Sequence, residues 1–139
     1  MLSLQKHARP DEHTKDLSAR LAEALSGSQL HFWKPGDPVA RLNRRVLIGV
    51  APYSRYDVNL LAALDELQLD SSFERIDIFD VLACQSQADF EKYIPGIEKV
   101  YQTPVVGLWE NRRLVQHLSG NNARELLMRM YDIDEARIR

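Results

Sequence analysis

Leucines repeat at helical spacing near the start of the chain. Leu17, Leu21 and Leu25 lie four residues apart with polar residues between them, which predicts an amphipathic helix over residues 11–26. Gly27 follows this stretch, and glycine readily takes the left-handed conformation that ends many helices. We therefore expect the chain to open with one helix that turns a single apolar face toward a core.

Two apolar runs of strand length follow this helix. Residues 29–33 predict a short edge strand, because two prolines and a glycine come directly after it. Residues 46–50 are apolar without interruption, which is the pattern of a central strand covered on both faces. From position 57 the period changes to that of a helix, which we expect to extend to residue 69 with Asp57 as its N-cap.

The second half of the chain continues this alternation of strands and helices. Residues 75–81 alternate between polar and apolar side chains and predict a strand parallel to the central one, because a single helix separates the two. The patterns that follow predict a short helix, a β-hairpin and a last helix that begins with an Asn122–Glu125 capping box, over residues 86–93, 105–118 and 122–131. The charged tail, residues 132–139, is expected to fray.

The composition fits a single domain. The chain has 139 residues, of which 45% are apolar and 27% charged, enough to bury one core. Its formal net charge is −2 and its pI is about 6.1, whereas general binders of nucleic acid or of anionic membranes carry a basic excess. We expect neither partner. Two short basic clusters, at residues 41–45 and 112–113, are expected to be solvated strand ends, with phosphate binding as the alternative.

The cysteine and histidine content limits the chemistry. Cys84 is the only cysteine, so no disulfide can form within the chain and a cysteine-rich metal site is excluded. The four histidines lack the spacing that places two ligands on one element, and we expect no metal and no cofactor. The chain shows no leader-like apolar start and no run near the roughly 20 apolar residues of a membrane span. We therefore expect a cytoplasmic protein.

A group of short motifs starts where the central strand meets the next helix. They are Ala-Pro-Tyr-Ser-Arg-Tyr-Asp at residues 51–57, Leu64-Asp65-Glu66 ten residues after Ser54, Thr103-Pro104, Asn111 and Gly120. In this order and spacing they resemble the thioredoxin-like superfamily over residues 46–131. The resemblance implies an α/β three-layer sandwich with a central mixed sheet flanked by helices and with a cis-proline at Pro104. Residues 1–45 would add an N-terminal helix and an edge segment to the same domain.

The chain departs from this family where the family performs its chemistry. Ser54 and Asp57 occupy the two positions of the Cys-x-x-Cys motif, and neither side chain can form a thiolate. Ile48 occupies the position of the buried acid that assists thiol deprotonation, and Ala62 that of a helix-kinking proline. An alternative alignment, to the Cys-Pro-Tyr-Cys of glutaredoxins, also leaves the motif without a cysteine. The resemblance therefore implies a member that performs no dithiol–disulfide exchange.

The residues around the former cysteine positions make up the predicted site. By the resemblance they line a groove beside Thr103 and Pro104, and they are Tyr53, Ser54, Arg55, Tyr56 and Asp57. Aromatic and arginine side chains on such a rim make good anchors, and the backbone before a cis-proline can pair with an extended peptide. We expect a redox-inactive binding, adaptor or chaperone-type protein with a protein partner. A nucleophilic Ser54 is the weaker alternative, because no Gly-x-Ser-x-Gly elbow is present.

Cys84 predicts a different function if its thiol is reactive. Its expected place just before a helix start would lower the thiol pKa, which would suit a thiol-dependent redox sensor or a glutathione-binding enzyme. The opposing expectation is a small, inert side chain packed against the sheet. A homodimer is a further expectation, in which the N-terminal helix and the Phe32–Trp33 segment form the interface or extend the groove.

Overall fold

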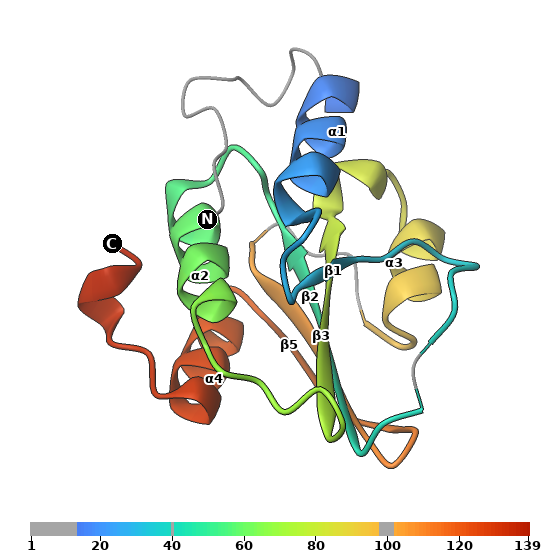
Figure 1. Ribbon diagram of the computed structural model, residues 1–139. Helices are drawn as coiled ribbons and strands as arrows, with labels where there is room; N and C mark the ends of the chain where they lie inside the picture. The colour runs from blue at the N-terminus through green and yellow to red at the C-terminus, as the bar shows by residue number, and fades with distance from the viewer. Residues whose placement is uncertain (1–13, 40, 98–101) are drawn as a thin grey trace.

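The chain folds around one five-stranded mixed sheet (Figure 1). The computed structural model describes residues 14–39, 41–97 and 102–139. The strands lie in the order β1-β3-β2-β4-β5; they are β1 (His31–Phe32), β2 (Arg44–Val50), β3 (Glu74–Asp80), β4 (Val105–Glu110) and β5 (Arg113–Ser119). β1 and β2 run parallel to β3, whereas β4 pairs antiparallel with β2 and β5 antiparallel with β4. The predicted central strand, edge strand, parallel pair and hairpin are therefore confirmed.

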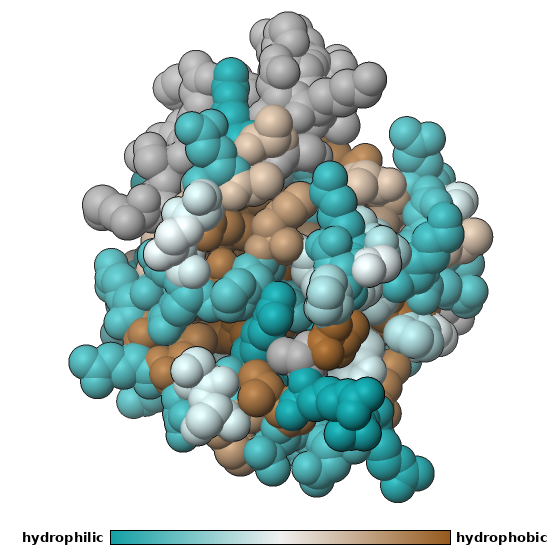
Figure 2. Space-filling model, turned by 45° about the vertical axis from the view of Figure 1, so that its right-hand side comes forward, coloured by the Kyte–Doolittle hydropathy of each residue, from teal (hydrophilic) through white to brown (hydrophobic). Residues whose placement is uncertain are grey.

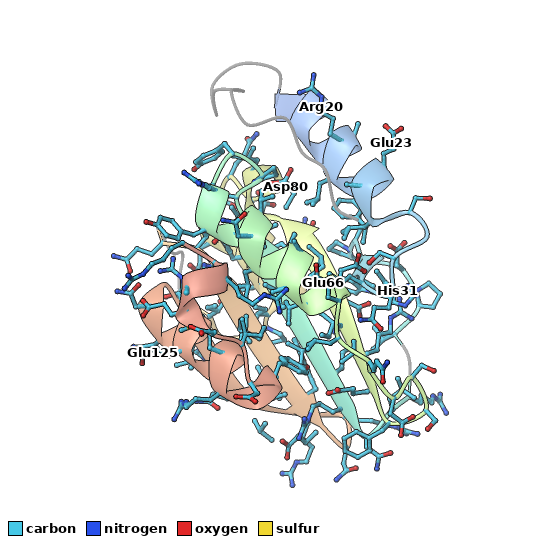
Figure 3. The ribbon with its side chains drawn as sticks, turned by 60° about the vertical axis from the view of Figure 1, so that its left-hand side comes forward. Arg20, Glu23, His31, Glu66, Asp80 and Glu125 are labelled. Atoms are coloured by element: carbon cyan, nitrogen blue, oxygen red, sulfur yellow. The ribbon has the colours of Figure 1, made fainter. Side chains whose placement is uncertain are left out.

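Helices cover both faces of the sheet. Figure 1 shows α2 and α4 beside each other on one side of the strands and α3 on the other side. The α-helices are α1 (Thr14–Leu25), α2 (Arg55–Asp65), α3 (Gln87–Tyr93) and α4 (Asn121–Tyr131), and two short 3₁₀ helices are η1 (Val81–Ala83) and η2 (Glu135–Arg137). Figure 3 shows the same arrangement from the α2–α4 side, with Glu66 directly after α2, Glu125 on α4 and His31 at the β1 edge. The α/β class is confirmed.

The first half of the core lies between the sheet and α1, α2 and α4. Val46, Ile48 and Val50 alternate along β2 toward this face and are at most 1% exposed. Because alternate side chains of a strand point to the same face, every second residue of the apolar run contributes here. Leu21 and Leu25 of α1 join the same cluster, as their spacing predicts, and Gly27 follows α1 with φ +81°. The side chain of Leu17 lies outside the described part of the chain.

The second half of the core lies on the α3 face and is aromatic. The ring of Phe79 stacks on Tyr93 with centroids 4.1 Å apart, and Trp33 meets Tyr93 edge-on at 5.8 Å. Gly49 makes this packing fit, because a Cβ there would come within 2.4 Å of Cζ of Phe79. Trp33 is only 6% exposed and its indole belongs to the core, whereas a homodimer through the N-terminal helix and the Phe32–Trp33 segment stays a prediction.

The crossover from β1 to β2 shapes the rest of the α3 face. β1 and β2 lie on opposite sides of β3, so the chain must cross one face of the sheet between them. Residues 33–43 make this crossover, and those of them that the structure describes form no helix. Because Trp33 belongs to the α3-side cluster, the crossover runs over that face. An irregular segment therefore covers the part of this face that lies near the start of β2.

Two predicted helix starts are wrong, because other residues than the predicted ones stand at the N-cap positions. α2 begins at Arg55, not Asp57, since Ser54 is the N-cap, and α2 ends at Asp65, before residue 69. α4 begins directly after Gly120, whose φ is +64°, and no side chain caps it. The Asn122–Glu125 capping box is therefore absent. At α3, by contrast, a side chain caps the helix, because the hydroxyl of Ser86 accepts from the amide of Asp89.

The tail after Asp132 is ordered, which contradicts the expected fraying. Ile133 is 7% exposed and Ile138 only 1%, and both join the cluster beneath α2 and α4. The side-chain amide of Asn59 donates to the carbonyl of Ile138 at 3.5 Å, and Arg137 forms an ion pair with Glu66. Residues 132–139 are rich in charge, but they also contain two isoleucines. The burial of these isoleucines holds the tail against the rest of the domain.

Candidate functional site

The predicted site begins where β2 ends and α2 starts. A tight turn connects them, in which the amide of Ser54 donates to the carbonyl of Ala51 at 2.9 Å. The hydroxyl oxygen of Ser54 then accepts from the amide of Asp57 at 3.4 Å, which caps the helix. An N-cap hydroxyl satisfies one of the unpaired amides of the first turn. The geometry therefore gives Ser54 a structural role, and no feature of the described residues favours the nucleophile.

Asp57 is buried rather than placed as the cap. Its side chain is 1% exposed, and Oδ2 accepts from the amide of Ala51 at 2.9 Å. Oδ1 is buried and has no hydrogen-bond partner among the described residues. Burial raises the pKa of Asp57 above its ordinary value of 3.8, while the Ala51 amide, the Thr103 side chain and the positive charge of Arg124 act in the opposite direction. The predicted N-cap role of Asp57 is therefore wrong.

Thr103 and Pro104 come directly before β4, the strand that pairs with β2, and they also lie near Asp57. The Thr103 side chain lies close enough to Asp57 to influence its ionisation, and the peptide bond between Thr103 and Pro104 is cis. The carbonyl of Pro104 accepts from the amide of Gly120 at 2.9 Å, which holds this segment against the start of α4. No backbone hydrogen bond joins Thr103 to another described residue. Two segments far apart in sequence thus meet around Asp57.

Aromatic side chains stand exposed at this end of the sheet. Tyr53 is 43% exposed and Tyr56 is 47% exposed, and Arg55 between them is also exposed. The guanidinium of Arg124, on α4, lies 5.1 Å from the centroid of the Tyr56 ring, a distance at which a cation and an aromatic face attract. We call Tyr53, Arg55, Tyr56 and the half-buried Thr103 the rim surface; Pro104, which was predicted to belong to it, is buried. Arg124 could not be found from the sequence, because only the tertiary fold brings the start of α4 to Tyr56.

Cys84 follows η1 and is half-buried. Burial raises the pKa of its thiol to about 12, and the negative charges of Asp89 and Asp80 act in the same direction. This is the opposite of the lowering expected from a helix start. Since the thiolate is the reactive form, a raised pKa argues against the redox-sensor and glutathione alternatives.

Arg45 departs from the expectation that the basic clusters are solvated strand ends. It is 6% exposed, and its Nε donates to Oδ2 of Asp77 at 2.7 Å. Nε of Arg75 donates to the other oxygen of Asp77 at 2.6 Å. The Arg45 guanidinium also lies 4.6 Å from the Trp33 ring centroid and 5.0 Å from that of Trp109. Arg45 is therefore a buried, paired charge between two indoles.

Neither a metal site nor a membrane span emerges from the described part of the chain. No three of its histidine, cysteine, aspartate and glutamate side chains are grouped so that they could hold a metal ion. None of the described helices is long and apolar enough to cross a bilayer.

Comparison with known proteins adds no relative: no family model matches the chain, and no curated protein matches it. The functional argument therefore rests on the geometry at the two ends of β2. One end carries the rim surface, and the other end carries Arg45.

Proposed function

We propose that this chain is a thioredoxin-like protein without dithiol chemistry that binds an extended segment of a protein partner at its rim surface. A cytoplasmic location is part of the proposal, since a chain with one cysteine needs no oxidising compartment.

The sheet supports the thioredoxin-like part of the proposal. A parallel β1-β3-β2 set extended by an antiparallel β4–β5 hairpin is the arrangement that the resemblance implies. The stretch at residues 51–57 lies at the carboxyl end of a central strand and opens α2. Ligand sites of open α/β sheets favour this end of the strands. Fold likeness alone does not carry a function, so the residues of the rim surface must do so.

The chemistry available there is that of binding. Ser54 is committed to the α2 cap and Asp57 to the amide of Ala51, and neither residue can supply a thiolate. What remains on the surface is two tyrosines and an arginine, side chains that are enriched in the energetically important parts of protein interfaces.

The observation that carries the proposal is the exposure of Tyr53 and Tyr56, at 43% and 47%, close to Thr103. Thr103 lies at the same end of the sheet, because its side chain is close enough to Asp57 to influence the ionisation of that residue. An extended peptide can pair by strand addition with the backbone before a cis-proline, while pockets or aromatic surfaces beside it select side chains. Because backbone pairing requires no particular sequence, the tyrosines would provide the specificity.

Site-specific crosslinking tests this proposal. A photoreactive phenylalanine analogue replaces Tyr53 in one variant and Phe73 in a control; the two native side chains are equally exposed, at 43%, but Phe73 lies near the opposite end of the sheet. In native lysate we expect the Tyr53 variant to crosslink one partner segment that the Phe73 variant does not. A synthetic peptide of that segment should compete, and Tyr56→Ala should weaken the competition.

Two results would contradict the proposal. Identical crosslinked proteins at both positions would show that the rim surface selects nothing. A peptide that competes equally well with Tyr56→Ala in place would show that the segment lies elsewhere. Turnover of a protein disulfide by the wild-type chain would overturn the redox-inactive part separately, because that activity does not depend on a partner segment.

A further inference from the structure

The two basic clusters of the sequence meet in one cleft near the start of β2. The cleft has a volume of about 370 Å³ and is lined by Val39, Arg41, Leu42, Arg45, Trp109 and Arg112. Arg45 and Trp109 are register partners on β2 and β4, and Arg112 sits in the β4–β5 turn with φ +69°. Residues from the irregular crossover close the remaining side. Clefts of this size are typical of sites for small molecules.

The guanidinium of Arg45 is incompletely satisfied. Its Nε is used by Asp77, but Nη2 is buried and has no hydrogen-bond partner among the described residues. A buried charged donor without an acceptor costs free energy and calls for an explanation such as a missing ligand. The indole N–H of Trp33, directly beside Arg45, is likewise buried without a partner. Arg45 lines the cleft, so its positive charge lies next to any ligand bound there.

The cleft carries surplus positive charge although the chain as a whole is acidic. The Asp77 carboxylate pairs with two arginines, Arg45 and Arg75. Its single negative charge balances only one of them, so that one positive charge remains uncompensated. Arg41 and Arg112 are exposed and form no ion pair with a described residue.

The nearby acids do not cancel this surplus. Asp37 does not line the cleft, and Glu110 follows Trp109 on β4, so that the alternation of a strand places it on the opposite face. Figure 2 turns this side of the molecule forward and shows strongly hydrophilic side chains gathered beside apolar ones in its lower part. The cleft therefore suits an anion of more than one charge.

Trp109, Val39 and Leu42 add a flat and apolar wall to these charges. Guanidinium groups match the geometry of phosphate oxygens, a phosphate monoester carries nearly two negative charges at neutral pH, and an indole face is a stacking platform for a base. We propose that this cleft binds a nucleoside monophosphate, with the phosphate held by Arg41, Arg45 and Arg112 and the base against Trp109. This inference is independent of the proposed protein partner at the rim surface.

Intrinsic fluorescence can measure this binding without a label. The chain has two tryptophans, and both lie against the Arg45 guanidinium, so that the signal reports on this cleft. The probes are AMP, GMP, CMP and UMP, with inorganic phosphate and the unphosphorylated nucleosides as references, at low ionic strength. We expect at least one nucleotide to bind about tenfold more tightly than inorganic phosphate, because base stacking adds to the phosphate contacts. Added salt should weaken the binding.

Exposed arginines provide the variants, because Arg45 is part of the core. Arg41→Ala and Arg112→Ala should each raise the dissociation constant about tenfold through loss of a charged hydrogen bond. Arg129→Ala, at an exposed arginine on α4, is the matched control and should leave it unchanged.

Three results would overturn the inference. The first is that no nucleotide binds more tightly than inorganic phosphate, and the second is that the Arg41 and Arg112 variants bind like the Arg129 control. The third is that a 5′-phosphorylated oligonucleotide binds more tightly than every mononucleotide, which would indicate a nucleic-acid surface instead.

Discussion

Asp57 and Asp77 are both buried near β2, but their surroundings differ in how far they compensate the negative charge of the carboxylate. Asp57, beyond the carboxyl end of the strand, accepts one hydrogen bond from Ala51 and keeps one oxygen without a partner among the described residues. Asp77, on β3, receives a guanidinium on each oxygen, from Arg45 and Arg75. Negative charge is thus poorly compensated at one end of the sheet and overcompensated at the other.

This difference separates the two ends by the ligands that they favour. An anion at the rim surface would add negative charge near a buried carboxyl group whose ionisation is already disfavoured. The same anion in the arginine cleft would meet uncompensated guanidinium groups. The rim surface therefore suits a peptide, through backbone pairing and aromatic contacts. The arginine cleft suits a phosphate group. Variants at each end test this difference.

The largest expected effect is at the arginine end. Asp77→Asn keeps the shape of the side chain but removes the charge that compensates Arg45, which is 6% exposed. Breaking one partner of a buried ion pair costs about 3 to 5 kcal/mol, and we expect a loss of that size in the free energy of unfolding, measured by urea denaturation. Glu91→Gln on the exposed side of α3 is the control and should change little. A loss below about 1 kcal/mol for Asp77→Asn would show that the Asp77 charge is dispensable.

A smaller loss is expected at the rim end from Ser54→Ala. The hydroxyl that accepts from the Asp57 amide disappears, and loss of an N-cap costs about 1 kcal/mol. The measurement is again the free energy of unfolding in urea. Ser54→Thr retains an acceptor and should recover most of the loss. Equal losses for the two variants would mean that the cap hydrogen bond is not the source of the effect.

The sequence predicted the elements well where periodicity alone decides them. The leucines of α2, the apolar run of β2 and the alternation in β3 each required a single pattern, and Leu60, Leu61 and Leu64 of α2 are buried. The α2 start was harder, because Ser54 and Asp57 are both good caps. The hydrogen bond from the Ser54 amide to the carbonyl of Ala51 forms the turn that places Ser54 at the cap. The types of the residues alone do not predict this turn.

The charged core could not be predicted from local patterns. Arg45 precedes an apolar run and Asp77 alternates with isoleucines, both of which are typical of solvent-facing positions. Arg45 is buried because Trp33 and Trp109, from separate parts of the chain, pack against its guanidinium, and Asp77 is its buried ion-pair partner. The arginine cleft has the same origin, since Arg41 and Arg112 approach each other only once the crossover and the hairpin turn are in place.

The smallest effect is the pH dependence that Asp57 introduces. Because the folded state raises the pKa of this carboxyl group above its ordinary value of 3.8, the folded protein binds the proton more tightly than the unfolded chain does. Wild-type stability therefore falls as pH rises from the unfolded-state value through the raised one. Asp57→Asn cannot ionise, so it should gain stability relative to wild type over this window, by urea unfolding at a series of pH values. Below the window the difference between the two proteins should be constant. Parallel curves across the whole range would mean that the charge of Asp57 is as well compensated as that of Asp77, and the contrast between the two ends would disappear.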